Sequence, residues 1–318
     1  MVWESLVTLS QLFLFPGFLF LFSLALFYQW VDRKAVARFQ NRQGPLYTGP
    51  LGLLQPLADL FKLLSKEFVI PEKANSFIFR LAPITLLAYC LIGMFVIPIA
   101  GPRALTHFEG DIILIIILFT LISITVFFCG WGSTGVYSVV GGVRAAMQLL
   151  VFEIPLAIVI MGPAILAKSL SMSELVLWQH ANASFAILQP IGFITFVICL
   201  LSELEVIPFD IPIAKGEIVA GWRTEFNGRG LALVMLASDV ELLLSASLVT
   251  TIYLGGPLPI WILPPIAGYI VKTTAIVFLF STLKSLFARF RLDQVLSGSW
   301  KFLVPLAIIQ IFLIELTK

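Results

Sequence analysis

Residues 112–131 read IILIIILFTLISITVFFCGW and contain no Asp, Glu, Lys or Arg. A run of about 20 apolar residues has the length of an α-helix that crosses the hydrocarbon core of a bilayer. The rest of the 318-residue chain has the same character, because 59% of its residues are hydrophobic and only 12% are charged. Soluble domains carry about 25% charged residues. The sequence therefore predicts an all-α polytopic membrane protein.

The chain holds eight apolar runs that are long enough to cross a membrane, and together they predict one membrane domain over residues 1–318. The runs are roughly 11–31, 77–100, 112–131, 145–167, 187–207, 231–255, 260–287 and 301–316. The first run lacks the basic segment and the small-residue cleavage site of a signal peptide, so we expect it to remain in the protein.

The basic residues gather in alternate connecting segments. Fourteen of the 20 Lys and Arg residues lie in the segments at about 32–76, 132–144, 208–230 and 288–301. Segments rich in Lys and Arg tend to stay on the cytoplasmic side of a membrane, so these four segments are predicted to be cytoplasmic loops. Both termini are then expected to lie on the outer side.

The first of these segments contains an amphipathic pattern. Its apolar residues recur at helical spacing opposite charged ones, which predicts a helix that lies along the membrane surface. The apolar positions are Leu53, Leu57, Leu60, Leu64 and Phe68, and the charged ones are Asp59, Lys62 and Lys66. The alternative is a helix that only fills a gap in the bundle.

Six ionisable residues fall within or at the ends of the predicted spans. They are Glu153, Glu203, Glu205, Asp239, Glu241 and Lys272. A charge inside a bilayer costs at least about 2.5–3.5 kcal/mol, so such groups are candidates for function. All five acids fall in the predicted cytoplasmic half, where neighbouring carboxyl groups can hold and pass protons. Oxygen ligands also suit Na⁺, and the alternative is a structural role for carboxylates at helix ends or for Lys272 paired with one acid.

The cysteines and histidines argue against a redox centre in this chain. Cys90, Cys129 and Cys199 lie in separate apolar runs, whereas an iron–sulfur cluster needs about four clustered thiolates. His107 and His180 are far apart in predicted loops, so we expect no haem, no metal site and no catalytic centre.

Four stretches resemble one protein family. They are VDRKAVARFQNRQGPLYTGPLGLLQPLADLFKLLSKE (31–67), GVRAAMQLLVFE (142–153), ELEVIPFDIPIAKGEIVAGWRTEFNG (203–228) and RFRLDQVLSGSWKFLVPLA (289–307). In this order they are similar to the membrane subunit at the foot of the peripheral arm of respiratory complex I, which is called the H subunit in bacteria and subunit 1 in mitochondria. Relatives of this family occur in membrane-bound energy-converting hydrogenases and in sulfur-reducing complexes.

The resemblance implies a non-redox subunit of an ion-translocating oxidoreductase in the plasma membrane of a prokaryote. It implies partners that carry the iron–sulfur clusters, together with antiporter-like and small membrane subunits, and no nucleic acid. The ion path that the resemblance implies comprises Glu153, Glu203, Asp210, Glu217, Glu225 and Lys272. The intramembrane acids Glu205, Asp239 and Glu241 are added to the expected path, although Asp239 and Glu241 are not expected in quinone-reducing members. The expected docking surface for the peripheral arm comprises Arg33, Lys34, Arg38, Gln40, Arg42, Gly44, Pro45, Asp59, Lys62, Arg144, Arg223, Arg291 and Asp293.

The chain departs from the family pattern after Pro208-Phe209-Asp210. Family members that use quinone have further acids here, but this chain has Ile213 and Lys215 and keeps only Glu217. The smaller acid cluster fits a quinone-free relative of the hydrogenase or sulfur-reducing type. The alternatives are a quinone-tunnel subunit of an NADH- or F420H2-type quinone oxidoreductase, a stand-alone ion carrier and a passive membrane anchor.

Overall fold

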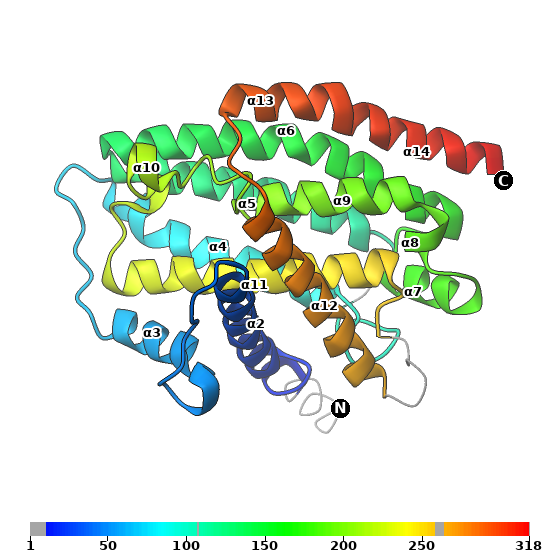
Figure 1. Cartoon of the computed structure of the whole chain (residues 1–318), viewed down its shortest axis with the longest axis horizontal. Coiled ribbons are helices and arrows are strands. Elements are labelled where there is room, and N and C mark those ends of the chain that lie inside the picture. The colour runs from blue at the N-terminus through cyan, green and yellow to red at the C-terminus, as the bar shows by residue number, and fades with distance from the viewer. Residues whose placement is uncertain (1–10, 107, 258–263, 318) are drawn as a thin grey trace.

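The computed structural model describes residues 11–106, 108–257 and 264–317, and all regular structure in these ranges is helical (Figure 1). The α-helices are α2 Phe18–Phe39, α3 Gln55–Leu64, α4 Ser76–Val96, α5 Asp111–Ser133, α6 Val136–Ala167, α7 Met172–Ala181, α8 Phe185–Leu188, α9 Pro190–Glu203, α10 Lys215–Ile218, α11 Gly228–Tyr253, α12 Pro265–Leu286, α13 Leu292–Gly298 and α14 Val304–Thr317. Single turns at η1 Pro50–Gly52, η2 Gly221–Arg223 and η3 Ser299–Leu303 complete the set.

The predicted class of all-α polytopic membrane protein is confirmed. Seven helical segments of the described residues are long and apolar enough to cross a membrane. They contain α2, α4, α5, α6, α11, α12 and the continuous run from α13 into α14. The predicted span 187–207 is occupied by α9, which is apolar but only 14 residues long. At 1.5 Å per residue α9 covers about 21 Å, which is less than the roughly 30 Å of a hydrocarbon core.

All four predicted loops are partly helical, since 32–76 contains α3 and 208–230 contains α10. The segment 132–144 was expected to be a loop, but α6 begins at Val136 and only residues 134–135 separate it from α5. Glycine allows close helix packing here, because a Cβ on Gly142 would lie 3.1 Å from the Cα of Gly130 on α5. The predicted loop 288–301 likewise contains α13. His107 and the start of the predicted span 260–287 lie outside the described residues.

The helices form a bundle in which α2 and α12 cross the others. In Figure 1, α4, α5, α6, α9, α11 and α14 run alongside one another, whereas α2 and α12 lie at a steep angle to them. Helix α11 lies at the centre and packs against α2, α4 and α12. Its burial on several sides explains why its sequence shows no polar stripe.

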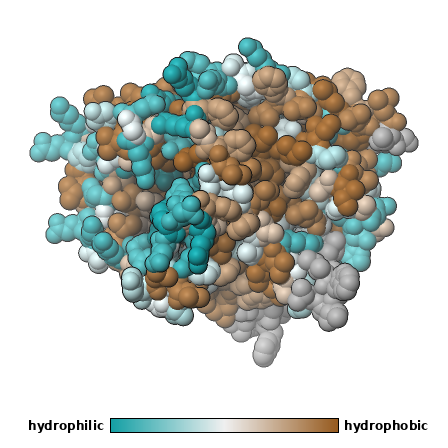
Figure 2. Space-filling view, in the orientation of Figure 1, coloured by the Kyte–Doolittle hydropathy of each residue, from teal (hydrophilic) through white to brown (hydrophobic). Residues whose placement is uncertain are grey.

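Polar and charged residues gather at one end of the bundle, which is the left side of Figure 2. We call this the charged end; it is formed by residues 40–54, α3, residues 65–75 and the loop 204–227. The sides of the long helices carry exposed apolar residues at helical spacing, such as Ile113, Ile117 and Ile124 on α5. Such a surface suits contact with lipid chains.

Proline in the middle of α6 frees a backbone carbonyl that another helix then satisfies. Pro155 has no N–H to donate to the carbonyl of Val151, which lies four residues earlier. The hydroxyl of Ser299 donates to that carbonyl at 3.2 Å. A buried carbonyl in a membrane protein has no water to replace a lost partner, so this bond also fixes the C-terminal segment on α6.

A second contact holds the C-terminal helix at the opposite end of the bundle. The Nε2 of Gln310 on α14 donates to the Oε1 of Gln189 at 2.6 Å. Gly162 on α6 and Gly192 on α9 leave the room for this amide, since a Cβ at either position would lie within 2.3 Å of it. Both glutamines are buried.

Helix α3 confirms the predicted amphipathic helix, although it is shorter than the pattern at 53–68. It runs from Gln55 to Leu64, buries Leu60 against the bundle and exposes Lys62. Proline at its second residue suits the first turn, where the backbone N–H has no helical partner.

Candidate functional site: buried acids beneath the loop 204–227

The loop 204–227 folds back against α6 because glycine occurs where chains cross. Gly221 has φ of +56°, and a Cβ there would lie 1.7 Å from the carbonyl oxygen of Pro212. Gly141 on α6 faces the same turn, and a Cβ on it would lie 2.4 Å from the backbone nitrogen of Trp222. The two glycines thus let the loop pack directly on the helix and carry the next residues inward.

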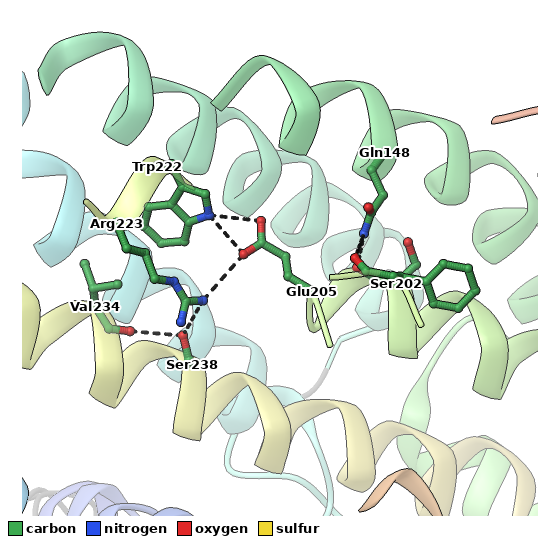
Figure 3. A network of polar contacts seen from close by, with 8 residues as sticks. Gln148, Ser202, Glu205, Trp222, Arg223, Val234 and Ser238 are labelled. Atoms are coloured by element: carbon green, nitrogen blue, oxygen red, sulfur yellow. Dashed lines mark hydrogen bonds and ion pairs between the residues drawn. The ribbon is translucent and has the colours of Figure 1, made fainter. Parts of the chain in front are cut away.

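Glu205, Trp222 and Arg223 form a buried polar network between the loop and α11 (Figure 3). The indole Nε1 of Trp222 donates to both carboxylate oxygens of Glu205, at 2.9 and 3.1 Å. The Nη2 of Arg223 lies 3.5 Å from Glu205 and donates to the hydroxyl of Ser238 on α11 at 3.1 Å. The backbone of Glu205 has φ of +51°, which is uncommon for a residue with a side chain and marks a position held by its contacts.

Gln148 on α6 ties the end of α9 to the same loop. Its Nε2 donates to the backbone carbonyls of Ser202, at 3.0 Å, and Phe209, at 2.9 Å (Figure 3). Gln148 is fully buried. One side chain therefore sets the position of the chain segment that carries Glu203 and Glu205.

Four acids from α6, α9, the loop and α11 come together at this place. Glu203 is only 2% exposed and lies close enough to Glu153, Glu205 and Glu241 to interact with each electrostatically. Neither carboxylate oxygen of Glu203 has a hydrogen-bond partner among the described residues. A buried carboxyl group without a counter-ion is costly in its charged form, so this group favours protonation or contact with a cation. We call these four residues the acid cluster.

Asp239 belongs to a different group on the other side of α11. It faces a cavity of about 250 Å³ whose lining includes Gln29 and Arg33 of α2 and Asp59 of α3. Arg33 pairs with Asp59 at 2.6 Å, which joins α2 to α3 at the rim of the cavity. Asp239 also interacts electrostatically with Arg33 and Arg223.

The rim of the loop carries charges that face solvent. Arg144 bonds Glu217 at 2.5 Å, and Arg289 lies 3.7 Å from the same carboxylate. The bond from Arg144 and the charge of Arg289 hold the pKa of Glu217 below its ordinary value. Partial burial raises the pKa of Asp210, and nearby Arg289 and Lys215 oppose this rise.

Two predicted members of the ion path lie elsewhere. The Nζ of Lys272 donates to the backbone carbonyls of Leu254, at 2.8 Å, and Gly256, at 3.0 Å, at the opposite end of the bundle from the charged end. Glu225 lies over Gly135, where a Cβ would come within 2.4 Å of its carboxylate. Neither residue is among the groups that act electrostatically on Glu203.

Comparison with known proteins places the whole chain in one family. A profile of the NADH dehydrogenase family matches residues 12–315. The H subunit of NADH-quinone oxidoreductase from Bacillus cytotoxicus is 38% identical over 324 aligned positions, which cover 99% of this chain and 97% of that protein. The chain belongs to the family of NADH-quinone oxidoreductase H subunits. Two such subunits from strains of Dehalococcoides mccartyi are 36% identical over 286 residues, covering 89% of this chain and 79% of theirs.

Membership of the H-subunit family confirms the predicted resemblance to the membrane subunit of complex I.

The residues expected to dock the peripheral arm are spread over the charged end and the segment after α12. The exposed ones are Arg38, Gln40, Arg42, Lys62, Arg291 and Asp293, and the partly exposed ones are Arg33, Lys34, Gly44, Pro45, Asp59, Arg144 and Arg223. Arg223 differs from the others because its guanidinium points inward to Glu205.

Three residues of this site were not predicted from the sequence. They are Gln148, Trp222 and Ser238, which supply donors and an acceptor to the acid-bearing segments. A lone Gln in an apolar span was a usable signal, because buried amides require partners. Trp222 gave no such signal, since a Trp in a loop is often a surface anchor.

Proposed function

We propose that this protein couples electron transfer in a complex I-like assembly to the translocation of H⁺ or Na⁺ through its buried acids. The observation that carries the proposal is the position of Glu203, buried without a hydrogen-bond partner beside Glu153, Glu205 and Glu241. Glu203 and the three carboxyl groups that interact with it cannot all be charged in a low-dielectric site, so a change of charge nearby changes their proton or cation occupancy.

The second part of the proposal is that the charged end anchors an iron–sulfur peripheral arm. The loop 40–54 exposes apolar side chains in the same segment as Arg42, and Tyr47 is 97% exposed. Leu51 and Leu54 are exposed in the same loop. Exposed aromatic and apolar residues among basic ones favour a soluble protein partner over bulk water. Antiporter-like and small membrane subunits are the expected neighbours within the bilayer.

The coupling role is tested in the intact complex reconstituted into liposomes. Glu203→Gln keeps the shape of the side chain but removes the exchangeable proton, so electron transfer should continue while most ion flux per electron is lost. Glu174→Gln, at an exposed position of α7, is the matched control. An unchanged ratio of ions to electrons in Glu203→Gln and Glu153→Gln would reject the coupling role and leave a passive anchor.

Purification separates the remaining alternative. In mild detergent, a stand-alone ion carrier is expected to purify without other subunits, whereas an anchor or coupling subunit copurifies with iron–sulfur subunits. Replacing Na⁺ by K⁺ in the flux assay then decides between H⁺ and Na⁺, because only a Na⁺ path loses its flux.

A second candidate function is to form a wall of a quinone path. The cavity between α2, α3 and α11 favours it, and so do the three relatives, each of which is named as a subunit of an NADH-quinone oxidoreductase. Ile213 and Lys215 favour the quinone-free, hydrogenase-like or sulfur-reducing type instead. Met235→Trp would fill this cavity from α11. Under the quinone function it raises the KM for a quinone acceptor, and under the quinone-free function electron transfer to the natural acceptor is unaffected.

A further inference from the structure

Arg223 lies between the acid cluster and the cavity that Asp239 faces. Its side chain extends from η2 of the loop toward α11, where it meets Ser238, the residue before Asp239 (Figure 3). On the loop side it lies 3.5 Å from Glu205. The guanidinium carbon also lies 4.7 Å from the centre of the Trp222 ring, whose face attracts the cation.

The hydrogen-bonding capacity of this guanidinium is only partly used. An arginine side chain has five N–H donors. The bonds to Glu205 and Ser238 both come from Nη2, and the buried Nε has no partner. A buried guanidinium with unused N–H groups can donate hydrogen bonds to a further carboxylate without breaking the bonds it already makes.

Arg223 is the charged group that Glu205 and Asp239 have in common. The charges that act on Asp239 are those of Arg33, Arg223 and Asp32. Glu205 interacts with Arg223, Asp210, Glu203 and Glu241. Within the described residues, Arg223 is thus the charged group that both acids share, and Asp239 interacts in addition with the cation of Arg33.

We propose that Arg223 is a shared counter-ion that links the cavity between α2, α3 and α11 to the acid cluster, dividing its charge between Asp239 and Glu205. When Asp239 loses its charge, the guanidinium turns fully to Glu205; when Asp239 gains charge, Glu205 is left with less compensation. Because Glu205 acts electrostatically on Glu203 and Glu241, the change reaches the acid cluster. Arg223 is a positioning residue in this scheme, and the link deepens the proposed coupling role, on which it rests.

The link is tested by the protonation of Glu205, followed by infrared pH titration of the intact complex in nanodiscs. Glu205→Gln identifies the carboxyl band. Asp239→Asn should lower the pH at which Glu205 protonates by about one unit or more, because Arg223 then serves Glu205 alone. The same Asp239→Asn change should have no effect in an Arg223→Gln background. Glu109→Gln and Arg229→Gln, both at exposed positions to which no role is assigned, are the matched controls for the two substitutions.

Two outcomes would overturn the link. If Asp239→Asn leaves Glu205 unchanged, Arg223 does not divide its charge, and this result requires no Arg223 variant to fold. If the shift is the same with and without Arg223, Asp239 acts on Glu205 directly. The titration is an equilibrium measurement, so it is independent of ion pumping and of the Glu203→Gln test of the coupling role.

Discussion

The hydrogen bond from Trp222 to Glu205 makes a prediction that can be measured locally. Trp222→Phe keeps an aromatic ring beside Arg223 but removes the N–H that bonds both oxygens of Glu205. The carboxylate is 4% exposed, so water cannot replace the lost donor. Loss of a hydrogen bond to a charged, buried group costs about 1.5–3 kcal/mol. The loop 204–227 should open more often by the corresponding factor, about 10- to 150-fold.

Hydrogen exchange in the intact complex measures this opening. The backbone amides of Arg223, Thr224 and Phe226 bond carbonyls within the turn and report its closed state. Their exchange should quicken in Trp222→Phe, whereas amides of α5 should be unchanged. A smaller ring also costs packing energy, so Glu205→Met provides the reference background, in which the acceptor is absent. If Trp222→Phe costs as much there as in the native background, to within about 0.5 kcal/mol, the bond contributes nothing and the reasoning is wrong.

Three further predictions concern other parts of the structure. Gly221→Ala places a Cβ on a backbone carbonyl at positive φ and should raise loop exchange at least as much as Trp222→Phe. Glu217→Gln removes the partner of Arg144. Because the pKa of Glu217 is lowered in the folded protein, the ion pair stabilises the fold at pH values above the ordinary pKa of Glu. This contribution disappears as the pH falls through the lowered pKa. The melting temperature of the variant should therefore be lower than the native one at pH 6, and the difference should vanish at low pH. Since Glu217 is exposed, the loss of stability is at most about 1 kcal/mol. Gly192→Ala collides with the amide of Gln310 and should increase proteolysis of α14, whereas Gly298→Ala, with open space around it, should not.

The helices were predictable because hydrophobicity and length alone define a membrane span. The run 112–131 corresponds to α5 within about two residues, since nothing polar interrupts it. Prediction failed at 132–144, which was assigned to a loop because it lies between two apolar runs and contains Arg144. In a membrane bundle Gly130 and Gly142 allow α5 and α6 to approach closely, and the gain in packing outweighs the low helix propensity of glycine.

The site was predictable in its acids but not in their grouping. Intramembrane charge alone singled out Glu153, Glu203, Glu205 and Glu241, and the structure brings these four together. The same rule also selected Lys272, which instead binds carbonyls at the end of α11. The energetic cost of burying a charged group shows which residues need a partner. The identity of that partner depends on the tertiary fold, and it cannot be derived from how deep each residue lies along its own helix.

Placing the shared cation on the loop has a physical consequence for coupling. Asp239 and Glu241 are fixed by the helical backbone of α11, whose interior hydrogen bonds resist local movement. Arg223 lies instead in a short turn that follows Gly221, and its long side chain can redirect its donors without breaking a helix. A charge that must respond to two acids is better carried by the loop than by either helix. The loop 204–227 also carries Glu217 at its surface, where partner contacts can act on it. The loop 204–227 thus carries both the solvent-facing Glu217 and Arg223. Through the guanidinium of Arg223 it also connects the cavity that Asp239 faces with the buried acid cluster.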